Sequence, residues 1–130
     1  MCIEIGMRGR AEAMVADGDT ARAMGSGLVP VFATPRMIAL MEEAAVNAVQ
    51  AALTQEEGTV GVRLDVTHDA ATPVGMRVWA EAEVTAVEGR KITFAVSAHD
   101  EREKIGGGVH ERFIIKTDKF LARAQGKLDR

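Results

Sequence analysis

The stretch Thr34–Leu53, TPRMIALMEEAAVNAVQAAL, decides the fold, because it is the longest segment whose apolar residues recur with the period of a helix. Thr34 suits the N-cap and Pro35 the first helical position, so the helix is predicted to run from residue 34 to about residue 53. Glu42 and Glu43 are adjacent within it. Neighbouring helical residues point about 100° apart, so the two glutamates cannot share one environment.

Glu43 belongs to a polar stripe with Asn47, so we expect Glu43 to be solvated. Glu42 lies between Ile38 and Val46 on the helical wheel, among aliphatic side chains. A carboxylate in that position is paired, hydrogen-bonded or shifted to a raised pKa, and a raised pKa suits acid–base chemistry near neutrality. The alternative is a boundary glutamate that reaches solvent or an arginine.

The segments on either side of the helix alternate with the period of a strand. The predicted strands span residues 3–16, 60–68, 76–84, 92–98 and 104–119. The predicted fold is therefore α+β in the order β-α-β-β-β-β, with the last four strands in a meander and the helix covering one antiparallel sheet. We expect all 130 residues to form a single domain.

Three shorter features complete this prediction. Asp19 is expected to cap a short helical stretch at residues 20–24. The glycine run at residues 106–108 predicts a bulge or a close backbone approach in the last strand. The polar tail at residues 122–130 is expected to fray.

The histidines divide by phase. His68 is in phase with Leu64 and Val66, so it is expected to point towards the core. His99 and His110 are out of phase with their apolar neighbours and are expected to be solvated.

Glu42 and His68 are thus two polar residues on apolar faces, and the fold allows them to face each other. Thr34, at the start of the helix, could add a hydroxyl near them, although it could equally serve as an N-cap alone. Each of the three has an ordinary structural role as its alternative.

The composition excludes several classes of function. No apolar run reaches the roughly 20 residues that span a bilayer. The single cysteine, Cys2, allows no internal disulfide and suits the cytoplasm. A net charge of −3 and 4% aromatic residues do not indicate nucleic-acid binding. The three histidines form no recognisable metal site, and no cofactor is expected.

Three segments resemble the fluoroacetyl-CoA thioesterase family of hotdog-fold proteins. They are FATPRMIALMEEAA at residues 32–45, GTVGVRLDVTHDAATPVGMRV at residues 58–78 and AVEGRKITFAVSAHDEREKIGGGVHERFII at residues 86–115. The resemblance covers roughly residues 28–126. It implies a hotdog fold, in which the sheet wraps the long helix, and a homodimer that joins its sheets edge to edge and holds acyl-CoA at the subunit interface.

The resemblance also implies roles for individual residues. The family's catalytic threonine, glutamate and histidine match Thr34, Glu42 and His68, and the glycine and arginine that contact substrate match Gly61 and Arg112. Glu42 would activate water or attack the carbonyl itself, with His68 as its acid–base partner and Thr34 as a positioning group. Arg112 would orient the acyl group, or else it is a surface arginine paired with a glutamate.

One segment departs from the family pattern. The fluoroacetyl-specific member has a phenylalanine-rich lid before the threonine, whereas residues 23–32 here read AMGSGLVPVF, with a single aromatic residue. We call this stretch the lid segment. We therefore expect hydrolysis of a short-chain or otherwise small acyl-CoA thioester and do not extend the fluoroacetyl specificity to this chain. The alternatives are a non-catalytic hotdog dimer that binds acyl-CoA and a hotdog hydratase or dehydratase.

Overall fold

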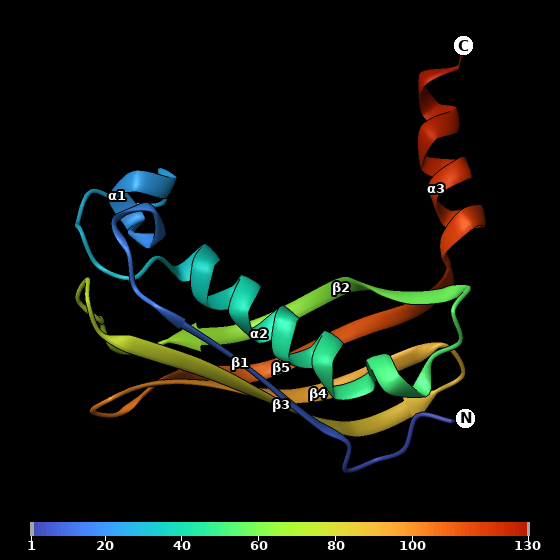
Figure 1. The fold of residues 1–130 in the computed structure, drawn as a ribbon, viewed down its shortest axis with the longest axis horizontal. Coiled ribbons are helices and arrows are strands. Elements are labelled where there is room, and N and C mark those ends of the chain that lie inside the picture. The colour runs from blue at the N-terminus through green and yellow to red at the C-terminus, as the bar shows by residue number, and fades with distance from the viewer. Residues whose placement is uncertain (1, 130) are drawn as a thin grey trace.

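The computed structural model describes residues 2–129 and contains one long helix packed on one sheet (Figure 1). The helices are α1 (Ala21–Met24), α2 (Thr34–Val49) and α3 (Thr117–Gln125). The strands are β1 (Arg8–Met14), β2 (Glu57–His68), β3 (Arg77–Glu88), β4 (Lys91–Asp100) and β5 (Lys104–Lys116). The predicted order β-α-β-β-β-β is confirmed, with α3 added after the last strand.

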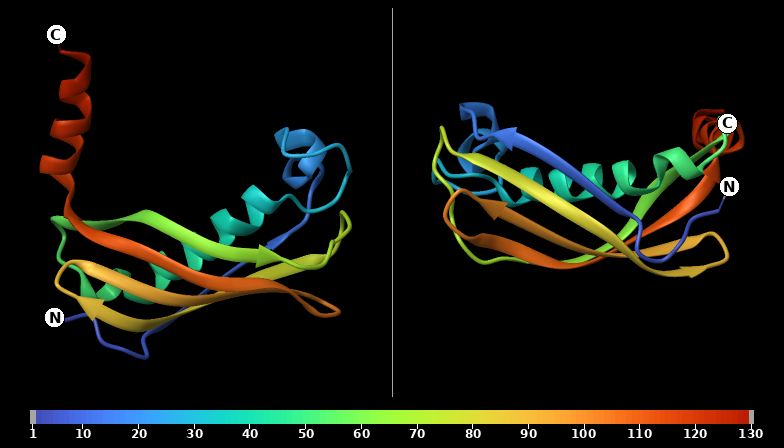
Figure 2. Two further views of the ribbon diagram at one scale, coloured as in Figure 1. Left: turned by 180° about the vertical axis from the view of Figure 1, so that it is seen from behind. Right: turned by 60° about the horizontal axis from the view of Figure 1, so that its bottom comes forward.

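The sheet has the strand order β1-β3-β4-β5-β2, and all of its pairings are antiparallel. Helix α2 lies along one face, and its Met37, Leu40 and Met41 are fully buried against that face. The facing side chains of β3 and β4, such as Val84 and Phe94, are also fully buried. The core thus lies between α2 and the middle of the sheet, and Figure 2 shows the sheet curving around the helix.

The predicted meander of four strands is wrong for β2. Strands β3, β4 and β5 do pair in sequence order, but β2 pairs with β5 and forms one edge of the sheet. The connection between β2 and β3, residues 69–76, crosses the end of the sheet, so consecutive strands need not be neighbours. Consequently, one edge of β2 is unpaired in this chain.

Several element boundaries and one helix cap also differ from the prediction. The first strand covers residues 8–14 rather than 3–16, and α2 ends at Val49 and continues as a 3-10 turn over Gln50–Ala52. Thr20, not Asp19, caps α1, since its hydroxyl accepts the Ala23 N–H at 3.2 Å.

The C-terminal end of the chain was also predicted wrongly. The last strand ends at Lys116 rather than near residue 119, and the tail expected to fray from residue 122 is helical to Gln125 and continues as a 3-10 turn over Gly126–Leu128. Residue 130 lies outside the described residues. Among residues 2–129, no helix has the length and apolar character that crossing a membrane requires.

The approach of α2 to β1 depends on a glycine. A Cβ built at Gly9 would overlap the carbonyl oxygen of Ala44 and the backbone nitrogen of Ala48 in α2. Two backbones can lie this close only where neither carries a side chain between them. Gly9 therefore sets the distance between the helix and the strand.

Gly9→Ala is predicted to destabilise the fold by about 1–3 kcal/mol, the cost of inserting a methyl group into a packed core. Gly18→Ala is the matched control, because a Cβ there meets nothing within 4 Å. Urea unfolding of both variants measures the difference. Equal midpoints for the two variants would contradict the close approach.

Candidate active site

Thr34 and His68 form the first group of the candidate site. The Thr34 Oγ1 and the His68 Nδ1 are 2.7 Å apart, which joins the first turn of α2 to the end of β2. Ala33, not Thr34, occupies the N-cap, so the threonine hydroxyl is not used for capping. The edge of the His68 ring packs on Phe32, with ring centroids 6.4 Å apart. The alternative of Thr34 as an N-cap alone is therefore excluded.

The other ring nitrogen of His68 has no protein partner. Its Nε2 is buried and is the single buried side-chain nitrogen or oxygen without a hydrogen bond among residues 2–129. Burial lowers the pKa of His68, although the charge of Asp69 acts in the opposite direction. A buried polar atom without a protein partner is rare in folded proteins, so this nitrogen is free to bond a group from outside the chain.

Thr34 and His68 line a cavity of about 310 Å³. Apolar residues of the lid segment, including Val29 and Phe32, form its other wall. A depression of about 540 Å³ elsewhere is lined by side chains of β1, β3 and β4, among them Arg10 and Glu81, and includes no residue predicted to be functional. The smaller cavity is the one that fits the predicted chemistry.

Glu42 belongs to a second group, centred on Arg112. The Arg112 Nη1 donates to the Glu42 Oε2 at 3.1 Å, and the guanidinium also donates to the hydroxyl and the carbonyl of Thr59. The Arg112 side chain is 7% exposed and that of Glu42 is 36% exposed. Glu42 is therefore paired, while Glu43 is exposed as predicted. Arg112 is paired with a glutamate, but it is buried rather than at the surface.

His110 completes this group, and its prediction as a solvated residue is wrong. It is fully buried, its Nδ1–H donates to the carbonyl of Arg63 at 2.8 Å, and its Nε2 accepts from the Arg112 Nη1 at 3.1 Å. Burial and the charge of Arg112 lower the pKa of His110. These contacts fit a neutral imidazole whose proton is on Nδ1.

The error at His110 has an identifiable cause. The pairing of β4 with β5 shifts register after Ala98, with Ile105 as the extra residue, so the inward phase of β5 changes there. Val109 and Phe113, which had set the expected inward phase, are 45% and 40% exposed. The close backbone approach predicted at residues 106–108 is confirmed, since a Cβ at Gly106 or Gly108 would overlap the backbone of β2, but the extra residue that changes the phase is Ile105. His99 is half-buried against Trp79, with ring centroids 5.6 Å apart.

Gly61 lies directly beneath the Glu42 carboxylate. A Cβ at this position would overlap the Glu42 Oε2 and would come within 3.3 Å of the Arg112 Nη1. Gly61 also precedes a register shift in the pairing of β2 with β5. The absence of a side chain therefore leaves room for the ion pair and for any group bound next to it.

The structure does not join the two groups within one chain. Thr34 and Glu42 are eight residues apart on α2, which corresponds to about 12 Å along the helix axis. No hydrogen bond or ion pair connects Glu42 with Thr34 or His68 in the described part of the chain. Both groups lie where α2 meets the edge strand β2, and each is half of the predicted constellation. No three metal-ligating side chains gather within residues 2–129.

Comparison with known proteins identifies the family. The family described as fluoroacetyl-CoA-specific thioesterase matches residues 15–118. The fluoroacetyl-CoA thioesterase of Streptantibioticus cattleyicolor is 47% identical over 97 residues, which cover 75% of this chain and 70% of that protein. The chain belongs to the fluoroacetyl-CoA thioesterase family.

Solved structures agree with this assignment. The structure of the fluoroacetyl-CoA thioesterase FlK has a TM-score of 0.92 and 38% identity, and the match covers 98% of both chains. A threonine-to-serine variant of that enzyme was solved with acetyl-CoA. A hypothetical protein of Thermus thermophilus, described as a thioesterase superfamily member, has a TM-score of 0.91 and 30% identity over 99% of this chain and 96% of its own. The predicted hotdog fold and membership of a family of thioester hydrolases are confirmed.

The buried histidines predict a pH dependence of stability. Because the folded-state pKa values of His68 and His110 lie below the ordinary value of about 6.5, the unfolded chain binds more protons just below that pH. Stability is therefore fully present above pH 6.5 and falls as the pH drops below it.

Urea unfolding between pH 7.5 and pH 5 measures this slope in the wild type and in His110→Gln. The variant is expected to be less stable at pH 7.5, since it loses hydrogen bonds, but to have a shallower slope. Parallel slopes would show that His110 is not held neutral.

Proposed function

We propose that this protein hydrolyses small acyl-CoA thioesters at a site completed by two copies of the chain. The observation that carries this proposal is the separation of the Thr34–His68 pair from the Glu42–Arg112 pair, both of which lie near β2, an edge strand of the sheet. The sequence contains the threonine, glutamate and histidine that thioester hydrolysis needs. Within one chain, however, Thr34 and His68 lie at one end of α2, and Glu42 lies further along the helix. A second copy at that edge can bring the two halves together.

The edge strand supports a homodimer. Strand β2 is twelve residues long, and an unpaired strand edge of this length readily pairs with another chain. Most dimers are twofold symmetric, and a twofold axis through the middle of β2 pairs the strand with its own copy in the antiparallel direction. The half of β2 that carries Gly61 then lies opposite the half of the partner strand that carries His68.

In this arrangement each subunit supplies different residues to a given site. One subunit supplies Thr34 and His68. The other supplies Glu42, with Gly61 and Arg112 around its carboxylate. The unpartnered His68 Nε2 would face the substrate and the partner's Glu42 instead of an empty cavity.

The proposed chemistry follows from these groups. Glu42 either activates a water molecule or attacks the thioester carbonyl itself, and both routes form a new C–O bond and break the C–S bond. His68 transfers the proton that the departing thiolate requires, and the Thr34 hydroxyl fixes the orientation of its ring. The backbone N–H of Gly61 stabilises the developing oxyanion. Arg112 holds the Glu42 carboxylate in place.

The cavity favours a small acyl group. Its volume of about 310 Å³ is shared with the mouth of the site, and the lid segment has a single aromatic residue, Phe32. A relative bound to acetyl-CoA supports coenzyme A as the thiol carrier. We do not extend the fluoroacetyl preference to this chain, because that preference accompanies a phenylalanine-rich lid.

The test is release of free thiol from a panel of acyl-CoAs, from acetyl to hexanoyl, with Glu42→Gln beside Glu43→Gln. The two substitutions remove the same charge from adjacent residues, but Glu43 is exposed and has no role in the proposed site. Glu42→Gln is expected to lower kcat about 100-fold or more, whereas Glu43→Gln leaves it unchanged. His68→Ala is expected to have an effect as large as that of Glu42→Gln.

Two results would contradict the proposal. If the wild type binds acyl-CoA but releases no thiol from any of them, the chain is a binding protein. If an enoyl-CoA is hydrated instead, the reaction class is wrong. Equal activity of the Glu42 and Glu43 variants would remove Glu42 from the mechanism.

A further inference from the structure

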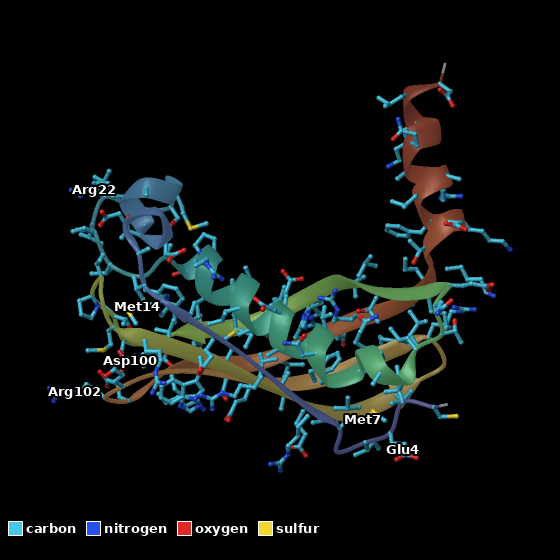
Figure 3. The ribbon with its side chains drawn as sticks, in the orientation of Figure 1. Glu4, Met7, Met14, Arg22, Asp100 and Arg102 are labelled. Atoms are coloured by element: carbon cyan, nitrogen blue, oxygen red, sulfur yellow. The ribbon has the colours of Figure 1, made fainter. Side chains whose placement is uncertain are left out.

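Helix α3 is not packed against another helix or the face of the sheet within residues 2–129. It projects from the end of β5 away from the sheet, and its side chains stand free on all sides (Figure 3). None of its residues is buried, and Phe120, Leu121 and Leu128 of this C-terminal segment are 40%, 57% and 74% exposed. Phe120 and Leu121 are neighbours on α3, and Leu128 lies in the 3-10 turn Gly126–Leu128 that follows it. Isolated helices of this length are marginal in water, so α3 needs a surface to pack on.

The position of α3 indicates where that surface lies. In Figure 1 the helix extends beyond β2, one of the two edge strands of the sheet. In Figure 2 it lies on the same side of the sheet as α2 and α1. A second copy joined to β2 would therefore meet α3 in the layer that contains the partner's helices.

A matching apolar surface lies at the opposite end of the molecule. The lid segment exposes Met24, Leu28 and Val29, with exposed fractions of 44%, 90% and 55%. Arg22 marks this end in Figure 3, far from α3 along the long axis. Helix α3 therefore cannot reach the lid segment of its own chain. A twofold axis through β2 exchanges the two ends, so the α3 end of one copy comes to the lid end of the other.

We propose that α3 crosses the dimer interface and packs its apolar side on the partner's lid segment, where it closes the partner's acyl cavity. This inference rests on the proposed dimer and extends the proposed function to a specificity element. Phe120 would supply from the partner subunit the aromatic wall that the lid segment lacks. The lid segment of one subunit and α3 of the other would then close the acyl cavity together.

The proposal accounts for two features that are otherwise unfavourable. Leu28 is almost fully exposed although it lies beside the candidate site, and a contact from α3 would remove it from water. The cavity that holds His68 is lined on the lid side by Gly27, which has no side chain, and by Val29, which is 55% exposed. A helix laid across this side would separate the bound acyl group from bulk solvent.

Cross-linking tests the contact without relying on activity. In a Cys2→Ser background, Phe120→Cys is combined with Met24→Cys, Leu28→Cys or Val29→Cys and treated with a short bismaleimide. At least one pair is expected to give a covalent dimer at low protein concentration. Phe113→Cys, combined with the same three, is the matched control, because Phe113 is also 40% exposed but lies on β5. Equal yields from the Phe120 and Phe113 pairs would overturn the proposal.

Kinetics test the role in specificity. Phe120→Ser is expected to raise KM for the preferred small acyl-CoA about tenfold or more and to reduce discrimination against longer acyl groups, whereas Phe113→Ser leaves both unchanged. Unchanged selectivity in Phe120→Ser would refute the role of α3 in selecting the acyl group.

The two proposals fail in distinguishable ways. Failure of the cross-link in a chain that hydrolyses acyl-CoA removes the α3 contact and leaves the function intact. A specific cross-link in a chain with no hydrolysis leaves the α3 contact intact and removes the function.

Discussion

A buried guanidinium must have its N–H donors satisfied, and this requirement organises the part of the sheet that meets α2. Arg112 uses its donors on Glu42, His110 and Thr59, which belong to the helix and to strands β5 and β2. Leaving such a charge buried without a partner would cost several kcal/mol. The ion pair therefore fixes Glu42 against β2, and the absence of a side chain at Gly61 leaves room for it. The position of the candidate carboxylate follows from the burial of its partner.

The same helix carries the other half of the site, so the proposed mechanism draws its two halves from different chains. An α-helix is rigid, so eight residues fix the separation of Thr34 from Glu42 whatever the loops do. The distance of about 12 Å is longer than any hydrogen bond can span. A symmetric partner at the β2 edge removes this difficulty, because it presents its own Glu42 to the Thr34–His68 pair. A dimer is in this sense a chemical requirement of the proposed mechanism as well as a way to cover an edge.

Much of the fold and part of the site could be predicted from the sequence. Helical periodicity located α2, and the wheel separated Glu42 from Glu43 correctly, because both depend on local geometry. The phase of β2 placed His68 inside for the same reason.

His110 could not be placed by simple alternation, since the extra residue Ile105 changes the phase of β5. The strand order failed because strand pairing depends on the whole sheet, and no local pattern shows that β2 joins β5. The helix over residues 117–125 was missed because its first residues were assigned to the last strand and its last residues to a polar tail.

Subunit complementation tests the central claim, a site shared between two chains, most directly. A chain carrying His68→Ala and a chain carrying Glu42→Ala are co-expressed with different tags, and the mixed dimer is isolated by tandem purification. Each variant alone is inactive, but in the mixed dimer one site contains both an intact His68 and an intact Glu42. The account predicts that this dimer recovers about half of the wild-type activity, because one of its two symmetric sites is complete. No recovery in a correctly assembled mixed dimer would contradict the account, since His68 and Glu42 would then have to act from the same chain.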